Sequence, residues 1–156
     1  MTDVERSDVD AAWLTAAVEL SRRCPPSASA FAVGAVVVAA DQSVLAEGWS
    51  RRDHPNDHAE EGDLRRMDPG DPRLDTATLY SSLEPCSRRL SRPRSCTALI
   101  LAGGIRRVVF ALREPAVFVE GRGAEELAAA GVVVVERPDF ADRVRAVNRH
   151  VLDPHD

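Results

Sequence analysis

The residues of this chain best suited to chemistry are a histidine, a glutamate and two cysteines. His58, Ala59 and Glu60 are consecutive, and Cys86 and Cys96 follow later in the chain. One imidazole and two thiolates suit a zinc ion, and a site with three protein ligands keeps a fourth position open for water. Glu60 can take a proton from that water. This combination predicts hydrolysis, and it is typical of the zinc-assisted removal of an amino group from a heterocyclic base.

The remaining cysteine and histidines do not add an obvious fourth ligand. They are Cys24, His54, His150 and His155, and none lies at a short ligand spacing from the other three. We therefore expect an open, catalytic site rather than a closed, structural one. Cys24, directly before Pro25, is better explained as a small hydrophobic residue.

The bulk properties restrict the class of protein. A length of 156 residues fits one domain with its own core, so we expect residues 1–156 to form a single zinc-dependent deaminase domain. The formal charge of −5 argues against a nucleic-acid partner. We find no apolar run that could span a membrane and no secretory signal. Three cysteines, an odd number, suit a reducing compartment, so we expect a cytoplasmic protein.

The hydrophobic pattern predicts an α/β fold. We expect strands over 32–40, 44–49, 78–82, 107–111 and 132–136, and helices over 8–23, 58–67, 96–102, 123–130 and 138–151. The short turn at 41–43 makes a hairpin of the first two strands. The later alternation of strands and helices implies parallel strands. The expected architecture is a three-layer α/β/α sandwich around a mixed five-stranded sheet, with a hairpin followed by three parallel strands.

Helix termini are expected to position the reactive groups. Asn56 or Asp57 should cap the helix that begins near His58, as Ser7 or Asp8 should cap the first helix. In the first turn after that cap, the histidine can reach a metal ion while Glu60 lies over the bound water. The backbone amide of Ala59 is then free to bind a substrate oxygen.

Further residues are candidates for substrate binding, each with a simpler alternative. Phe31 could stack on a base ring, or it could belong to the core. Asn56 could bind the substrate or only cap the helix. Arg88 and Arg89 lie in the arginine-rich stretch 87–95, which could clamp a phosphate or simply be solvated.

Several stretches taken together have the motifs of a known family. They are residues 33–38, 58–60, 78–80, 83–87, 98–105, 113–115 and 119–123. The chain resembles the cytidine deaminase superfamily, and most closely the deaminase domain of the bifunctional riboflavin-biosynthesis deaminase/reductase enzymes. The resemblance implies the cytidine deaminase type of fold and one zinc ion per chain, bound by His58, Cys86 and Cys96. It also implies Glu60 as both base and acid, and a homodimer or higher homo-oligomer.

The chain departs from that family in places that bear on the substrate. Residues 87–95 make a longer loop between the two cysteines, and Ala30-Phe31-Ala32 replaces an Asn-Pro pair. Ser50 stands where the family has a histidine, and the reductase domain is absent. We therefore expect a small aminopyrimidine or related aminated heterocycle, as base, nucleoside or nucleotide. The candidates are an aminopyrimidine nucleotide of the riboflavin pathway and a substrate of the cytosine or dCMP type.

Two other functions are weighed against this one. A deaminase of adenosine or cytidine within nucleic acid would need a positive surface, which the acidic balance disfavours. A non-catalytic, zinc-stabilised subunit would not need Glu60 and would favour a fourth ligand. We therefore expect an enzyme with a small-molecule substrate.

Overall fold

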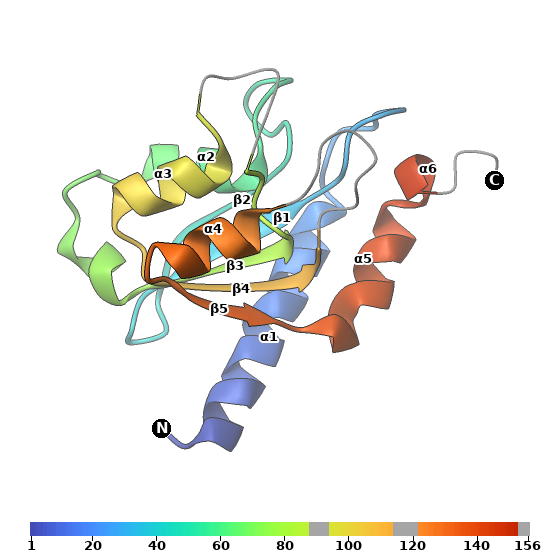
Figure 1. The fold of residues 1–156 in the computed structure, drawn as a ribbon. Coiled ribbons are helices and arrows are strands. Elements are labelled where there is room, and N and C mark those ends of the chain that lie inside the picture. The colour runs from blue at the N-terminus through green and yellow to red at the C-terminus, as the bar shows by residue number, and fades with distance from the viewer. Residues whose placement is uncertain (88–93, 114–121, 153–156) are drawn as a thin grey trace.

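A mixed five-stranded sheet organises the fold of this computed structural model, which describes residues 1–87, 94–113 and 122–152 (Figure 1). The strands are β1 (Gly34–Val38), β2 (Val44–Trp49), β3 (Thr78–Leu83), β4 (Arg107–Leu112) and β5 (Val133–Glu136). Their order is β2-β1-β3-β4-β5. β1 is antiparallel to β2 and β3, whereas β3, β4 and β5 run parallel. The predicted hairpin and parallel strands are thus confirmed.

Helices cover both faces of the sheet. They are α1 (Asp3–Ser21), α2 (Ala59–Arg66), α3 (Cys96–Gly103), α4 (Gly123–Ala129), α5 (Ala141–Val147) and α6 (Arg149–Leu152), with 3₁₀ turns at Pro72–Thr76 and Pro138–Phe140. Figure 1 shows α2, α3 and α4 over one face, with α1 and α5 on the other. This is the predicted three-layer α/β/α sandwich. Among the described residues, no helix is both long and apolar enough to cross a membrane.

The first helix begins earlier than predicted. Its N-cap is Thr2, whose hydroxyl accepts a hydrogen bond from the backbone amide of Glu5 at 3.1 Å. The Glu5 carboxylate accepts in return from the amide of Thr2 at 3.0 Å. This reciprocal capping box satisfies two backbone amides at the helix start. The prediction of Ser7 or Asp8 as the cap was therefore wrong.

The last helix is interrupted at a buried asparagine, where the sequence predicted a continuous helix. The Asn148 side chain is fully buried and accepts a hydrogen bond from the backbone amide of Ala32 at 2.7 Å. It also donates to the carbonyls of Ala32, at 3.1 Å, and Val144, at 3.0 Å. Both backbone groups of Ala32 are therefore bonded to this one side chain, and β1 begins two residues later than predicted.

A close approach between α1 and β1 requires a glycine. A Cβ atom added to Gly34 would lie 2.0 Å from the carbonyl oxygen of Ala17 and 2.6 Å from the amide nitrogen of Ser21. Both neighbours are backbone atoms of the helix, so they cannot move aside. Gly34 thus fixes how closely α1 lies on the sheet.

An ion pair under α1 adds a directional contact to this packing. Asp10, which is 3% exposed, accepts two hydrogen bonds from the Arg107 guanidinium at 2.8 and 2.6 Å. The Tyr80 hydroxyl donates a third at 2.7 Å. Because the pair is bidentate and shielded from water, loss of one partner would leave a buried charge without compensation.

We expect Asp10→Ala to lower the free energy of unfolding by about 3–5 kcal/mol, the usual cost of breaking a buried pair. The matched control is Asp75→Ala, which removes the exposed ion pair between Asp75 and Arg106. Exposed pairs contribute about 0–1 kcal/mol, so this variant should unfold almost as the parent does. Chemical denaturation measures both, and equal losses would contradict the assigned importance of Asp10.

Candidate metal centre and active site

Three potential metal ligands from distant parts of the chain meet in one place. The ligand atoms of His58, Cys86 and Cys96 all lie within 4.8 Å of one another. The Nδ1 atom of His58 is 3.5 Å from the sulfur of Cys86 and 3.3 Å from that of Cys96. Ligands on a tetrahedral zinc ion are roughly 3.3–3.8 Å apart, given the usual zinc–ligand lengths. The spacing and the donor types therefore fit zinc.

Each ligand is held where a regular element begins or ends. His58 is the N-cap of α2, Cys96 is the first residue of α3, and Cys86 follows the end of β3. The predicted caps Asn56 and Asp57 were wrong, since Asp57 is buried and accepts two hydrogen bonds from Arg65 instead. These positions are well fixed because the elements pack against the same sheet.

Two neighbouring segments support the turn that carries Cys86. Thr97 donates from its amide and its hydroxyl to the Cys86 carbonyl, at 3.1 and 2.7 Å. At the start of α4, a Cβ atom on Gly123 would lie 1.9 Å from the Pro85 carbonyl oxygen. The fully buried Glu84 carboxylate accepts a hydrogen bond from the Ala124 amide at 2.8 Å. The first turns of α3 and α4 thus hold this ligand from both sides.

The surroundings of Cys86 favour its thiolate, the form that binds metal. Its sulfur accepts a hydrogen bond from the backbone amide of Cys96 at 3.2 Å. Hydrogen bonds from Cys96, followed by the hydrogen bond and charge of His58, lower the pKa of Cys86 to about 4, against the opposing effect of burial. A thiol prepared in this way can bind zinc at neutral pH.

Glu60 lies in the first turn of α2, two residues after His58, and its side chain is buried. The hydroxyl of Ser81, on β3, lies 2.7 Å from the Oε1 atom of Glu60. Burial raises the pKa of the Glu60 carboxyl, although the charge of His58 and the hydrogen bond of Ser81 oppose that rise. A carboxyl with a raised pKa is suited to proton transfer near neutral pH.

Asp63, one turn further along α2, is a buried carboxyl that the sequence analysis missed. It is fully buried, and within the described residues neither of its oxygens has a hydrogen-bond partner. A Cβ atom on Gly48 of β2 would lie 2.6 Å from Oδ1, so the carboxyl occupies space that only glycine leaves. Burial, and then the charge of Glu60, raises the pKa of Asp63 well above its usual value. Its surroundings therefore favour the protonated form of the Asp63 carboxyl.

The other residues considered for substrate binding are less closely tied to this cluster. Ala59 is fully buried at the first position of α2. Phe31 is half-buried and packs against the core cluster that contains residues of α1 and α5. Its backbone carbonyl accepts a hydrogen bond from the Arg51 guanidinium at 3.1 Å. Asn56 is exposed, and its backbone amide donates a hydrogen bond to the Nδ1 atom of the His54 ring at 3.1 Å. Arg88 and Arg89 lie outside the described residues.

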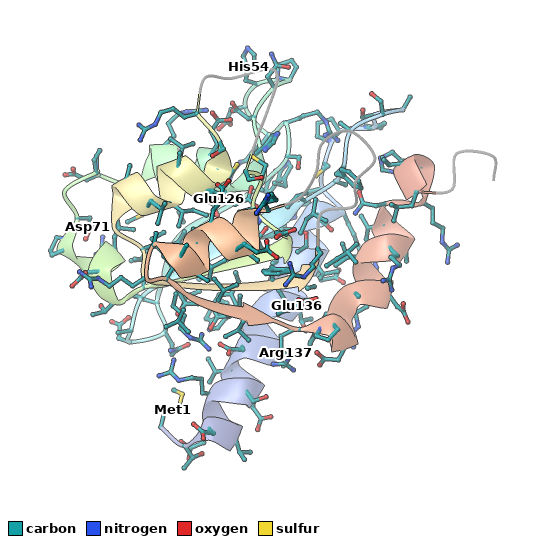
Figure 2. All side chains as sticks on the ribbon, in the orientation of Figure 1. Met1, His54, Asp71, Glu126, Glu136 and Arg137 are labelled. Atoms are coloured by element: carbon teal, nitrogen blue, oxygen red, sulfur yellow. The ribbon has the colours of Figure 1, made fainter. Side chains whose placement is uncertain are left out.

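The alternative metal ligands lie in other surroundings. Figure 2 shows His54 on the loop before α2, pointing away from the sheet. The ring of His150 lies 2.8 Å from the carbonyl oxygen of Ala30. The thiol of Cys24 lies 3.5 Å from the carbonyl oxygen of Val33. Among the described residues, the only group of three or more potential ligands is His58, Cys86 and Cys96. His155 lies outside them.

Comparison with known proteins identifies the family. Residues 7–112 match the family described as the cytidine and deoxycytidylate deaminase zinc-binding region. This match covers more than half of the chain, which therefore belongs to that family. The description of the family as zinc-binding agrees with the expected metal.

Similar proteins carry names from riboflavin biosynthesis. The chain is 39% identical, over 132 residues, to a diaminohydroxyphosphoribosylamino-pyrimidine deaminase of Schizosaccharomyces pombe, covering 83% of this chain and 32% of the relative. It is 40% identical, over 102 residues, to the riboflavin biosynthesis protein RibD of Escherichia coli, covering 65% and 26%. This chain thus spans a third or less of these relatives.

A solved structure has the same architecture. The diaminohydroxyphosphoribosylaminopyrimidine deaminase/5-amino-6-(5-phosphoribosylamino)uracil reductase of Thermotoga maritima superimposes with a TM-score of 0.79 at 28% identity. The superposition covers 94% of this chain and 42% of that one. The predicted similarity to the deaminase domain of the bifunctional enzymes is therefore confirmed.

We expect Cys86→Ser and Cys96→Ser each to abolish tight zinc binding, because a hydroxyl is a far poorer ligand for zinc than a thiolate. Elemental analysis of the purified variants should find less than about a tenth of the parent's zinc, and their melting temperatures should fall. Cys24→Ser is the matched control and should keep its zinc. Full zinc in either ligand variant would contradict the assigned metal site.

We also expect Asp63 to make the fold less stable as pH rises. A carboxyl whose pKa is higher in the folded state holds a proton that the unfolded chain has released. Stability should therefore fall as pH increases above the usual carboxyl value of 3.8, up to the raised folded value. Asp63→Asn cannot ionise, so its free energy of unfolding should decline less between pH 5 and 9 in denaturation series.

The control for this measurement is Asp142→Asn, which changes a carboxylate that is 96% exposed in α5. Its pH dependence should match that of the parent. Besides Glu60, the charged groups that act on Asp63 are Arg66, Arg52 and Glu47, and all of them remain in both variants. Identical slopes for the Asp63 variant and the parent would show that Asp63 ionises normally.

Proposed function

We propose that this member of the cytidine and deoxycytidylate deaminase family is a zinc-dependent hydrolase that releases ammonia from an aminopyrimidine nucleotide. The observation that carries the proposal is the arrangement of Glu60. A buried carboxyl, two residues from His58, accompanies three ligands that suit an open zinc site. A purely structural zinc site would have four protein ligands and would not need this acid.

The residues of the chain account for the proton transfers of such a reaction. Zinc bound by the three ligands would lower the pKa of a water molecule and so provide a nucleophile at neutral pH. Glu60 would accept one proton of the attacking water as the water oxygen bonds to the carbon that carries the amino group, and would pass this proton to the adjacent ring nitrogen. It then transfers the second proton to the departing amine. The carbon–nitrogen bond breaks, a carbonyl forms, and water and substrate are converted to product and ammonia.

The substrate class follows from the relatives. The Schizosaccharomyces pombe protein, named a diaminohydroxyphosphoribosylamino-pyrimidine deaminase, shares 39% identity over 83% of this chain. An aminopyrimidine that carries a ribose phosphate is therefore our first candidate. Arg88 and Arg89 are proposed to bind the phosphate, and the Ala59 amide to bind the ring. Phe31 and Asn56 are proposed as secondary contacts.

Other expectations from the sequence remain proposals of the same kind. We propose one zinc ion per chain, a single deaminase domain over residues 1–156, and self-association into a homodimer or larger assembly. A reducing, cytoplasmic environment suits the site because both cysteine ligands must stay unoxidised. The net charge of −5 supports a small-molecule substrate over nucleic acid.

We expect Glu60→Gln to keep its zinc and lose at least roughly 100-fold in the rate of ammonia release, the scale of general acid–base catalysis. The glutamine has the same shape but cannot carry the proton. The measurement is an ammonia assay over aminopyrimidine nucleotides, cytosine nucleosides and nucleotides, free pyrimidines and single-stranded nucleic acid, with zinc analysis of each preparation.

The matched control is Glu126→Gln, at an exposed position that Figure 2 labels on α4. This variant should retain the parent's activity. Turnover by Glu60→Gln at the parent's rate would remove the assigned role of Glu60. Ammonia release from nucleic acid alone would overturn the proposed substrate class.

A further inference from the structure

Ser81 is a buried hydroxyl that contacts Glu60 and has no role in the mechanism above. It lies in β3, in the middle of the sheet, and is fully buried. Its oxygen is 2.7 Å from the Oε1 atom of Glu60 and also 2.7 Å from the carbonyl oxygen of Leu83. Since bulk water does not reach this position, the hydrogen bonds of Ser81 must be made within the protein.

A serine hydroxyl has one proton to donate, whereas two acceptors lie at the same distance. When Glu60 is a carboxylate, the Ser81 hydroxyl can donate to it. When Glu60 is protonated, the carboxyl can donate to the oxygen of Ser81, and the hydroxyl proton can turn to the Leu83 carbonyl. Only the hydroxyl proton changes direction, and no heavy atom needs to move.

We propose that Ser81 is a positioning residue for Glu60, holding its carboxyl in one place both before and after it takes a proton. This inference rests on the proposed role of Glu60 as base and acid. In each turnover Glu60 gains and loses a proton, and whenever the Oε1 atom carries that proton, this oxygen needs a partner that accepts it. Ser81 serves both states because a hydroxyl can donate and accept.

The position of the contact supports this role. Glu60 approaches from α2, and Ser81 lies on β3, the strand that leads into the turn carrying Cys86. The hydrogen bond therefore links the acid to the element that also places a zinc ligand. Small errors in the position of a catalytic group cost large factors in rate, so a fixed carboxyl matters for turnover.

The decisive comparison is between Ser81→Thr and Ser81→Val, two side chains of almost the same shape that differ by the hydroxyl. We expect Ser81→Val to lower kcat roughly 10- to 100-fold, the scale of a hydrogen bond to a charged group, with KM and zinc content little changed. Ser81→Thr should recover most of that loss. The assay is ammonia release from the substrate that the parent enzyme turns over fastest.

A second pair of variants tests the same role without enlarging the side chain, in case threonine or valine does not fit at the buried position 81. Ser81→Ala should lower kcat to a similar extent, whereas Ser82→Ala should not. Ser82 is an equally buried neighbour whose hydroxyl accepts from the Gly34 amide at 3.1 Å. It therefore controls for the loss of a buried hydroxyl from the same strand.

The outcomes separate this inference from the proposed function. Equal kcat for Ser81→Thr and Ser81→Val, or equal losses for Ser81→Ala and Ser82→Ala, would overturn the role of Ser81 while leaving that of Glu60. An active Glu60→Gln variant would overturn the role of Glu60 first. A loss of zinc from Ser81→Ala would mean that Ser81 supports the metal site instead, and would likewise overturn the inference.

Discussion

The structure depends on one geometric requirement, that three donor atoms from separate parts of the chain lie within one coordination sphere. His58, Cys86 and Cys96 meet it because each stands at the start of a helix or just after a strand. The parallel pairing of β3 with β4, and the packing of α2 and α3 over the sheet, fix those positions in turn. Gly123 and Thr97 then hold Cys86, which lies in the turn after β3.

Four of the buried carboxyl groups show how differently the same chemical group is accommodated. Asp10 forms an ion pair with Arg107. Glu84 accepts a hydrogen bond from the backbone amide of Ala124 at the start of α4. Glu60 has the hydroxyl of Ser81 beside it, whereas Asp63 has no hydrogen-bond partner among the described residues. The hydrogen bonds and the charge of Arg107 lower the pKa of Asp10 against the opposing effect of burial. Burial raises the pKa of Glu60 and of Asp63 instead, and both residues lie on α2.

Much of the site and the sheet could be predicted from sequence, because local spacing encodes both. The ligand motif is visible in the order of residues, and the strand pattern follows from runs of valine. The features that were missed depend on contacts between distant elements. Ser81 and Asp63 acquire their meaning only when β3 and β2 lie beside α2. The break at Asn148 likewise depends on Ala32, which is 116 residues away. Thr2 and Glu5, by contrast, form a recognisable capping signature that could have been found.

The contact between Asn148 and Ala32 also bears on how the protein is made. Ala32 leads into the first strand of the sheet, yet its amide and carbonyl are both satisfied by a side chain 116 residues further along. During translation the ribosome releases the segment before β1 long before Asn148 emerges. That segment must therefore wait, with its polar backbone still hydrated, until Asn148 has left the ribosome.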